Sequence, residues 1–235
     1  MKTLLLCLAF ITIFIGIPGQ VYATSLTVNF DSGMTSWAIP GVRDNANGGS
    51  MAGMNVTFYW QDSAGFSRVD TGTWTGSGDD GGVSLSFGVV QFSLSESGDT
   101  FSGIWTLSKV ATSSHITRIL IDAFPANTVF DTYFNAGVGT SGSGLGSNFQ
   151  MVSATGLVGD IVATYRDLVN VDGNAPVGDL YRYLDIAFPD SVGFRSGTLE
   201  FTADTDPISN VPSPGTILLL GSGLIGLALF GKILR

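Results

Sequence analysis

The chain has 235 residues, of which 44% are hydrophobic and 12% charged, and its formal net charge is −9. All 19 acidic residues but only seven of the ten basic residues lie between Thr24 and Asn210, which gives this part a net charge of about −12. Binding to nucleic acid requires a basic face that contacts phosphates, so this charge balance excludes nucleic acid as a partner. The same stretch is long enough for one sizeable domain.

The first 23 residues have the pattern of a secretory signal peptide. Lys2 provides a positive start, Leu4 to Ile17 is apolar, and small residues end at Ala23. A first transmembrane helix is the alternative, but the apolar stretch is short and a cleavage site follows it. We therefore expect an N-terminal signal helix over residues 1–23 that is removed after Ala23.

Cys7 is the single cysteine, and it lies inside this signal segment. The mature chain would then contain no cysteine, which excludes disulfides, thiolate metal sites and cysteine nucleophiles. An exported domain without disulfides must be stable through its own core.

Short stretches of alternating apolar and polar residues follow one another along the central chain, separated by Gly, Asp, Asn, Ser or Pro. This period of two predicts β-strands, and no stretch shows a sustained helical period. We therefore expect an all-β fold, a single β-sandwich or jelly-roll-like domain over residues 24–203. The expected strands are 26–30, 54–60, 83–87, 91–95, 104–110, 116–123, 160–165, 181–188 and 198–203. The tryptophans and most phenylalanines are expected to fill its core.

The sequence presents few residues suited to catalysis, and we assign no catalytic residue. His115 is the only histidine, so a histidine-dependent triad would have to use it, but no G-x-S-x-G elbow accompanies it. Two GxGxxG matches, at 137–142 and 221–226, lack the strand and helix that a dinucleotide site needs. No cofactor-binding or metal-binding residue is assigned with them.

Calcium is the cofactor that remains open, because hard cations bind carboxylate and carbonyl oxygens. The segment "RDNANGGS" does not place ligands at the EF-hand positions, although Asp44, Asn45 and Asn47 could still bind an ion in a loop. Asp204 and Asp206, in "TADTDP", are the second candidate pair. A structural calcium ion is thus left open.

The last part of the chain reads as a linker over 204–210 followed by a membrane tail over 211–235. Two prolines precede an apolar run at about 216–231, and Lys232 and Arg235 are the only charges beyond it. A helix of about 16 residues spans roughly 24 Å, slightly less than the hydrocarbon core of a bilayer. Because basic ends stay on the cytoplasmic side, the domain should lie outside the membrane.

This tail resembles the PEP-CTERM sorting tail of exported proteins from polysaccharide-producing Gram-negative bacteria. The resemblance rests on Val211, Pro212, Ser213 and Pro214, on the apolar helix and on the basic end, with Ser213 where the family usually has Glu. It implies processing by an exosortase-type membrane enzyme. The segment from Ser97 to Asp131, with a Gly-Asp-Thr-Phe turn and a closing Thr-Val-Phe-Asp, also resembles uncharacterised exported proteins with such tails.

The resemblance and the composition together lead to one expectation of function. We expect an exported protein of the cell envelope or polysaccharide matrix that is non-enzymatic, structural or carbohydrate-binding. It would be anchored transiently through its C-terminal helix, with extracellular polysaccharide as a second partner. The alternative is a glycan-active hydrolase or lyase on a jelly-roll scaffold, which would need two facing carboxylates in a cleft.

Overall fold

A computed structural model describes residues 25–44, 46–133, 139–140, 143, 145–171, 177–189 and 191–209. The expected signal peptide with its cleavage at Ala23, the sorting motif Val211–Pro214 and the helix at about 216–231 lie outside the described residues. Within those residues, no helix has the length and hydropathy to cross a membrane.

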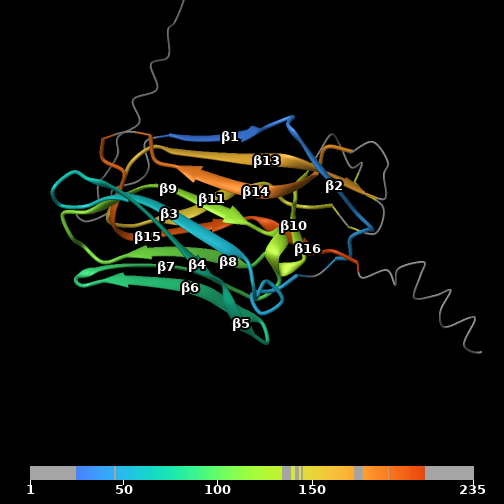
Figure 1. Cartoon of the computed structure of the whole chain (residues 1–235), viewed down its shortest axis with the longest axis horizontal. Coiled ribbons are helices and arrows are strands. Elements are labelled where there is room, and N and C mark those ends of the chain that lie inside the picture. The colour runs from blue at the N-terminus through green and yellow to red at the C-terminus, as the bar shows by residue number, and fades with distance from the viewer. Residues whose placement is uncertain are drawn as a thin grey trace, which may run out of the picture.

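The described chain is all-β, as the sequence predicts, with one 3-10 turn, η1 (Phe124–Ala126), as its helical element (Figure 1). Its strands are β1 (Leu26–Phe30), β2 (Met34–Ile39), β3 (Asn55–Gln61), β4 (Ser67–Thr73), β5 (Thr75–Ser77), β6 (Asp80–Phe87), β7 (Val90–Ser97), β8 (Ile104–Lys109), β9 (His115–Asp122), β10 (Thr128–Asp131), β11 (Gln150–Ala154), β12 (Leu157–Val158), β13 (Ile161–Val171), β14 (Leu180–Ala187), β15 (Phe194–Thr202) and β16 (Asp204–Pro207).

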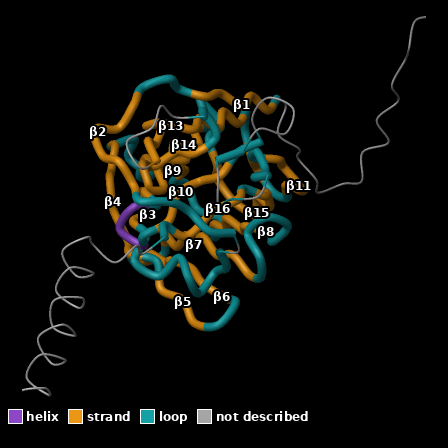
Figure 2. The backbone as a smooth tube through the Cα atoms, turned by 90° about the vertical axis from the view of Figure 1, so that its right-hand side faces the viewer, coloured by secondary structure: helices purple, strands orange, loops and turns teal. Residues whose placement is uncertain are grey.

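The strands form one continuous sheet with the order β1-β13-β14-β9-β15-β8-β7-β6-β5, to which β2, β3, β4, β10, β11, β12 and β16 add at the sides. Most pairs are antiparallel, whereas β1 and β2 run parallel to β13. The sheet turns at β15, which pairs with β9 through Phe194 and Ile116 alone but follows β8 over five residue pairs. Figure 2 shows the two resulting layers, with β13, β14 and β9 in one and β6, β7 and β8 in the other.

Aromatic side chains join the two layers through a shared core. The ring of Phe58 on β3 stacks on Phe92 of β7 at 5.0 Å, and that of Trp105 on β8 lies 6.4 Å from Phe130 of β10. Strand β3 buries alternate residues, as its apolar pattern predicts. The arrangement is consistent with a β-sandwich, and the expected role of Trp60, Trp74 and Trp105 in the core is confirmed.

Seven strands lie outside the stretches that the sequence predicted, β2, β4, β5, β10, β11, β12 and β16, and two of them are instructive. Strand β4 was not predicted because its residues are mostly polar and exposed, and it pairs only with β3 at the edge of the sheet. Residues 204–207, which the sequence assigned to the linker, form strand β16 and pair with β10. The sequence Asp-Thr-Asp-Pro resembles a loop, but here it pairs with β10 over four residue pairs.

Candidate functional site

Two polar sites lie at opposite ends of the same strands. Strand β14 begins at Leu180, opposite Asp131, and ends at Ala187, beside Arg118 of β9. Its eight residues span roughly 25 Å at about 3.4 Å per residue. Figure 1 shows β10 and β16 at the right-hand end of the sheet, and the loops that follow β3 and β14 lie at the other end.

The first site is an open hollow of about 760 Å³ between β3, β9 and the turn from β14 to β15. Tyr59 and Gln61 point to the same side of β3 because side chains alternate along a strand, whereas Trp60 points into the core. The register then places Tyr59 beside Arg118 and Gln61 beside His115. The hollow is lined by Tyr59, Gln61, His115, Thr117, Arg118, Ala187, Phe188, Pro189, Ser191 and Arg195.

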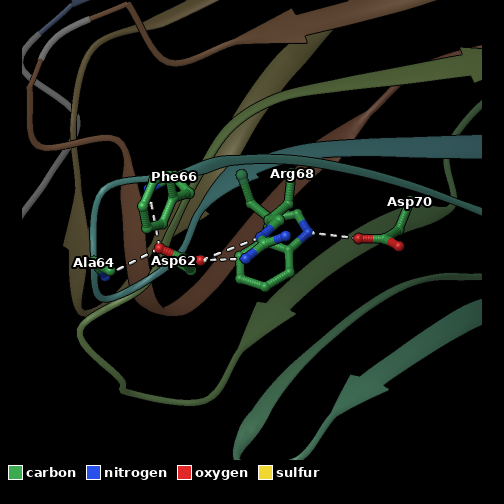
Figure 3. A network of polar contacts seen from close by, with 6 residues as sticks. Asp62, Ala64, Phe66, Arg68 and Asp70 are labelled. Atoms are coloured by element: carbon green, nitrogen blue, oxygen red, sulfur yellow. Dashed lines mark hydrogen bonds and ion pairs between the residues drawn. The ribbon is translucent and has the colours of Figure 1, made fainter.

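The hairpin that follows Gln61 is held by a polar network (Figure 3). The Asp62 carboxylate accepts hydrogen bonds from the backbone N–H groups of Ala64 and Phe66, both at 3.0 Å. It also forms an ion pair with Arg68 at 2.9 Å. These contacts lower the pKa of Asp62, with the bond from the Phe66 N–H as the largest cause. The turn therefore fixes the end of β3 at the edge of the hollow.

Positive charge gathers around the hollow although the protein is acidic. The guanidinium carbon of Arg118 lies 4.8 Å from the centre of the Tyr59 ring, and its Nε contacts the buried Asp185 at 2.6 Å. Arg195 donates from one guanidinium nitrogen to the carbonyl of Ser191 at 3.1 Å. Burial, and then the charge of Arg195, lowers the pKa of Lys109 to about 8, and its Nζ donates to the Arg195 carbonyl.

His115 is the first residue of β9 and lines this hollow, half-buried. Its Nδ1 is buried and has no hydrogen-bond partner among the described residues. Burial is the main cause that lowers its pKa, and the charges of Arg195 and Lys109 add to the effect. The lowered pKa favours the neutral form of the ring, and the ring lines the hollow beside Gln61. Such a hollow can bind a polar, negatively charged ligand.

The second site is a cluster of three buried carboxylates, Asp131, Asp204 and Asp206, which we call the carboxylate cluster. One oxygen from each lies within 4.8 Å of the oxygens of the other two. The side chains are 1%, 6% and 3% exposed, respectively. Because the three oxygens converge and the set contains no nitrogen or sulfur ligand, this cluster could hold a hard metal ion.

Burial raises the pKa of every carboxyl group in the cluster. The pKa of Asp131 rises to about 8, that of Asp204 to about 7 and that of Asp206 to about 6. The charges of neighbouring carboxylates add to the shifts. Hydrogen bonds from Ser143 and Thr100, and one between the Asp131 and Asp206 side chains, oppose them. The charges that raise these pKa values come from the cluster itself and from Asp44, Asp99 and Asp179.

Hydroxyl groups and one glycine enclose the cluster. Thr100, in the turn between β7 and β8, donates to Asp204 Oδ1 at 3.0 Å, and Ser143 donates to Asp131 Oδ2 at 2.5 Å. Gly146 packs so closely against Asp131 that a Cβ atom would collide with its backbone and carboxyl carbon. The chain therefore passes directly over the carboxylates.

The structure separates the two calcium candidates that the sequence left open. Asp204 and Asp206 lie together in the cluster, and Asp131 joins them although no sequence signal pointed to it. In the other candidate, the side-chain oxygen of Asn47 accepts the Ser50 N–H at 2.8 Å, so it already closes a local turn. Asp44 is exposed, and Asn45 and most of the 137–142 glycine motif lie outside the described residues.

A comparison of the chain with protein-family models, with curated proteins and with solved structures gives no match. The geometry of the two sites is therefore the basis on which a function can be inferred.

Proposed function

We propose that this is an exported, non-enzymatic component of the cell envelope or polysaccharide matrix, which binds carbohydrate in the hollow between β3 and β9. Its β-strands would form a sandwich of the jelly-roll type. The signal peptide would direct export, and the tail would hold the domain at the membrane until an exosortase-type enzyme acts near Val211–Pro214. The observation that carries the binding role is the presence of two arginines, Arg118 and Arg195, in the lining of the hollow.

The lining fits an acidic sugar better than a neutral one. Gln61 and Thr117 offer amide and hydroxyl groups that can exchange hydrogen bonds with sugar hydroxyls. A guanidinium group binds a carboxylate through two parallel N–H groups. Of the two arginines in the lining, Arg118 is paired with Asp185, whereas Arg195 forms no ion pair with a described carboxylate. A uronate unit of a polysaccharide presents both kinds of group at once.

Hydrolysis of a glycan would need two carboxylates that flank the bond to be cleaved. The described residues that line the hollow include no carboxylate. The carboxylate cluster does not substitute for them, because its side chains are buried and lie at the other end of the sheet. These observations favour binding over hydrolysis.

The test is binding of the full-length protein, in detergent, to an immobilised uronate polysaccharide and to a neutral glucan. Arg195→Ala should weaken binding to the uronate polymer at least tenfold, about 1.4 kcal/mol. Arg43→Ala is the matched control, because it removes the same charge from an exposed position beside β16. Equal binding of both polymers, or an equal loss in the control, would contradict the proposal.

A further inference from the structure

The pairing of β10 with β16 brings three like charges together on one face. Asp131 lies directly opposite Asp204 in this antiparallel pair, and Asp206 follows two residues later on the same side of β16. Like charges directly opposite one another destabilise a strand pair. The arrangement is therefore stable only if protons or a cation neutralise it.

Hydrogen bonds within the protein satisfy only part of the cluster. Thr100 and Ser143 each donate to one carboxylate oxygen, as described above. Asp131 Oδ1 and Asp206 Oδ2 have no hydrogen-bond partner in the described part of the chain, although their side chains are only 1% and 3% exposed. Buried polar atoms are nearly always paired, so in this converging cluster the two oxygens must either share a proton with each other or bind a ligand.

The donor set decides which ligand this is. Three carboxylates with no histidine or cysteine among them suit a hard cation. Two ligands of one calcium ion lie at most about 4.8 Å apart, since each is about 2.4 Å from the ion, and the cluster meets this limit. Magnesium demands shorter bonds and a near-ideal octahedron, which it usually completes with several waters. Calcium accepts the irregular oxygen set that two paired strands provide.

We propose that Asp131, Asp204 and Asp206 bind one calcium ion, and that this ion fastens β16, the last described strand, to the rest of the domain. Thr100 already links the turn before β8 to β16, because its hydroxyl contacts Asp204 and accepts the Thr205 N–H at 3.1 Å. The ion adds a second link between β10 and β16. This site lies away from the hollow and does not depend on the carbohydrate-binding role.

The site also has a consequence for where the domain is stable. Calcium sites of extracellular modules bind with dissociation constants of about 10⁻⁴–10⁻³ M. A site in this range fills outside the cell and stays empty in the cytoplasm. The strand next to the tail would then become fully stable only after export.

Thermal unfolding of the full-length protein in detergent tests the proposal, with calcium chloride as the probe. Calcium at ten to one hundred times its dissociation constant should raise Tm by roughly 3–10 °C, and EDTA should reverse the rise. Calorimetric titration should give one ion per chain, with magnesium binding at least tenfold more weakly. Absence of saturable calcium binding to the wild type would overturn the proposal by itself.

Two substitutions separate a metal site from a merely structural cluster. Asp206→Asn should abolish the calcium-dependent rise in Tm, and in EDTA it should be at least as stable as the wild type because one repelling charge is gone. Glu96→Gln is the matched control, since Glu96 is also a buried carboxylate with two unpaired oxygens but lies outside the cluster. It should keep the full calcium response. A response that survives in Asp206→Asn, or disappears in Glu96→Gln, would refute the assignment.

Discussion

The two ends of the sheet each bury a carboxylate, but they neutralise it in different ways. At the hollow, Asp185 contacts Arg118 at 2.6 Å and Arg166 at 2.8 Å. At the opposite end, Asp131 is equally buried but contacts a hydroxyl group and other carboxylates instead of a described cation. The chain provides the counter-charge at one end, and we infer that the solvent provides it at the other.

The two ends are neutralised differently because arginine side chains are long and need space to reach a buried carboxylate. Arg118 and Arg166 keep their guanidinium groups partly exposed while they reach the buried Asp185 from two neighbouring strands. Gly146 lies so close to Asp131 that there is no space for a side chain at this position. A small ion fits where an arginine side chain does not.

The largest effect should come from the core that the two ends share. Trp105 is fully buried, stacks on Phe201 at 5.9 Å, and donates from Nε1 to the carbonyl of Ala203, next to Asp204. Trp105→Ala should lower the free energy of unfolding by about 3–5 kcal/mol in a denaturant titration, because it leaves a cavity and an unpaired carbonyl. It should impair both ligand binding and the calcium response. Phe66→Ala, at an exposed position, should change stability little.

The next effect contrasts Asp185, a buried carboxylate with two arginine partners, with Asp206, a buried carboxylate that has no described cation beside it. Arg118→Gln removes one of the two cations on Asp185 and the contact with the Tyr59 ring, so it should destabilise the protein by about 1.5–3 kcal/mol. In EDTA, Asp206→Asn should show no such loss, because it removes a repelling charge. Denaturant titrations of both variants, with Arg68→Gln as an exposed arginine control, make the comparison. Equal destabilisation at both ends would show that the two carboxylates are held alike.

The last effect concerns pH and Glu96, a buried carboxylate outside both sites. Burial, and then the charges of Asp99, Asp80 and Asp79, raises its pKa to about 8 from an ordinary value of 4.5. Between these two values the folded state keeps a proton that the unfolded state has lost, so the stability of the wild type should fall as pH rises. Glu96→Gln should remove this contribution.

The measurement for Glu96 is the difference in unfolding free energy between the variant and the wild type, at constant calcium, from pH 4 to pH 9. The difference should move in favour of the variant between about pH 4.5 and pH 8. A difference that stays constant over the whole range would show that folding leaves the pKa of Glu96 unchanged.

Much of the fold could be predicted from local alternation alone. Stretches such as 54–60 and 91–95 alternate apolar and polar residues, and they form β3 and part of β7 with the expected faces buried. The same rule did not predict β16, because residues 204–210 were expected to be a linker, and only the structure places Asp204 and Asp206 on one side of a strand. Strand β4 could not be predicted this way, because an edge strand with few buried side chains carries no apolar alternation.

The sequence by itself determined the all-β class and the core-facing residues of the long strands, because these follow from the period of two along one strand. Only the tertiary structure decided that Asp131 lies opposite Asp204 and that His115 lies beside Gln61. Strand pairing joins residues far apart in the chain through backbone hydrogen bonds, which are the same for every side chain. The partners are therefore selected by the packing of the whole sheet, and both candidate sites depend on that selection.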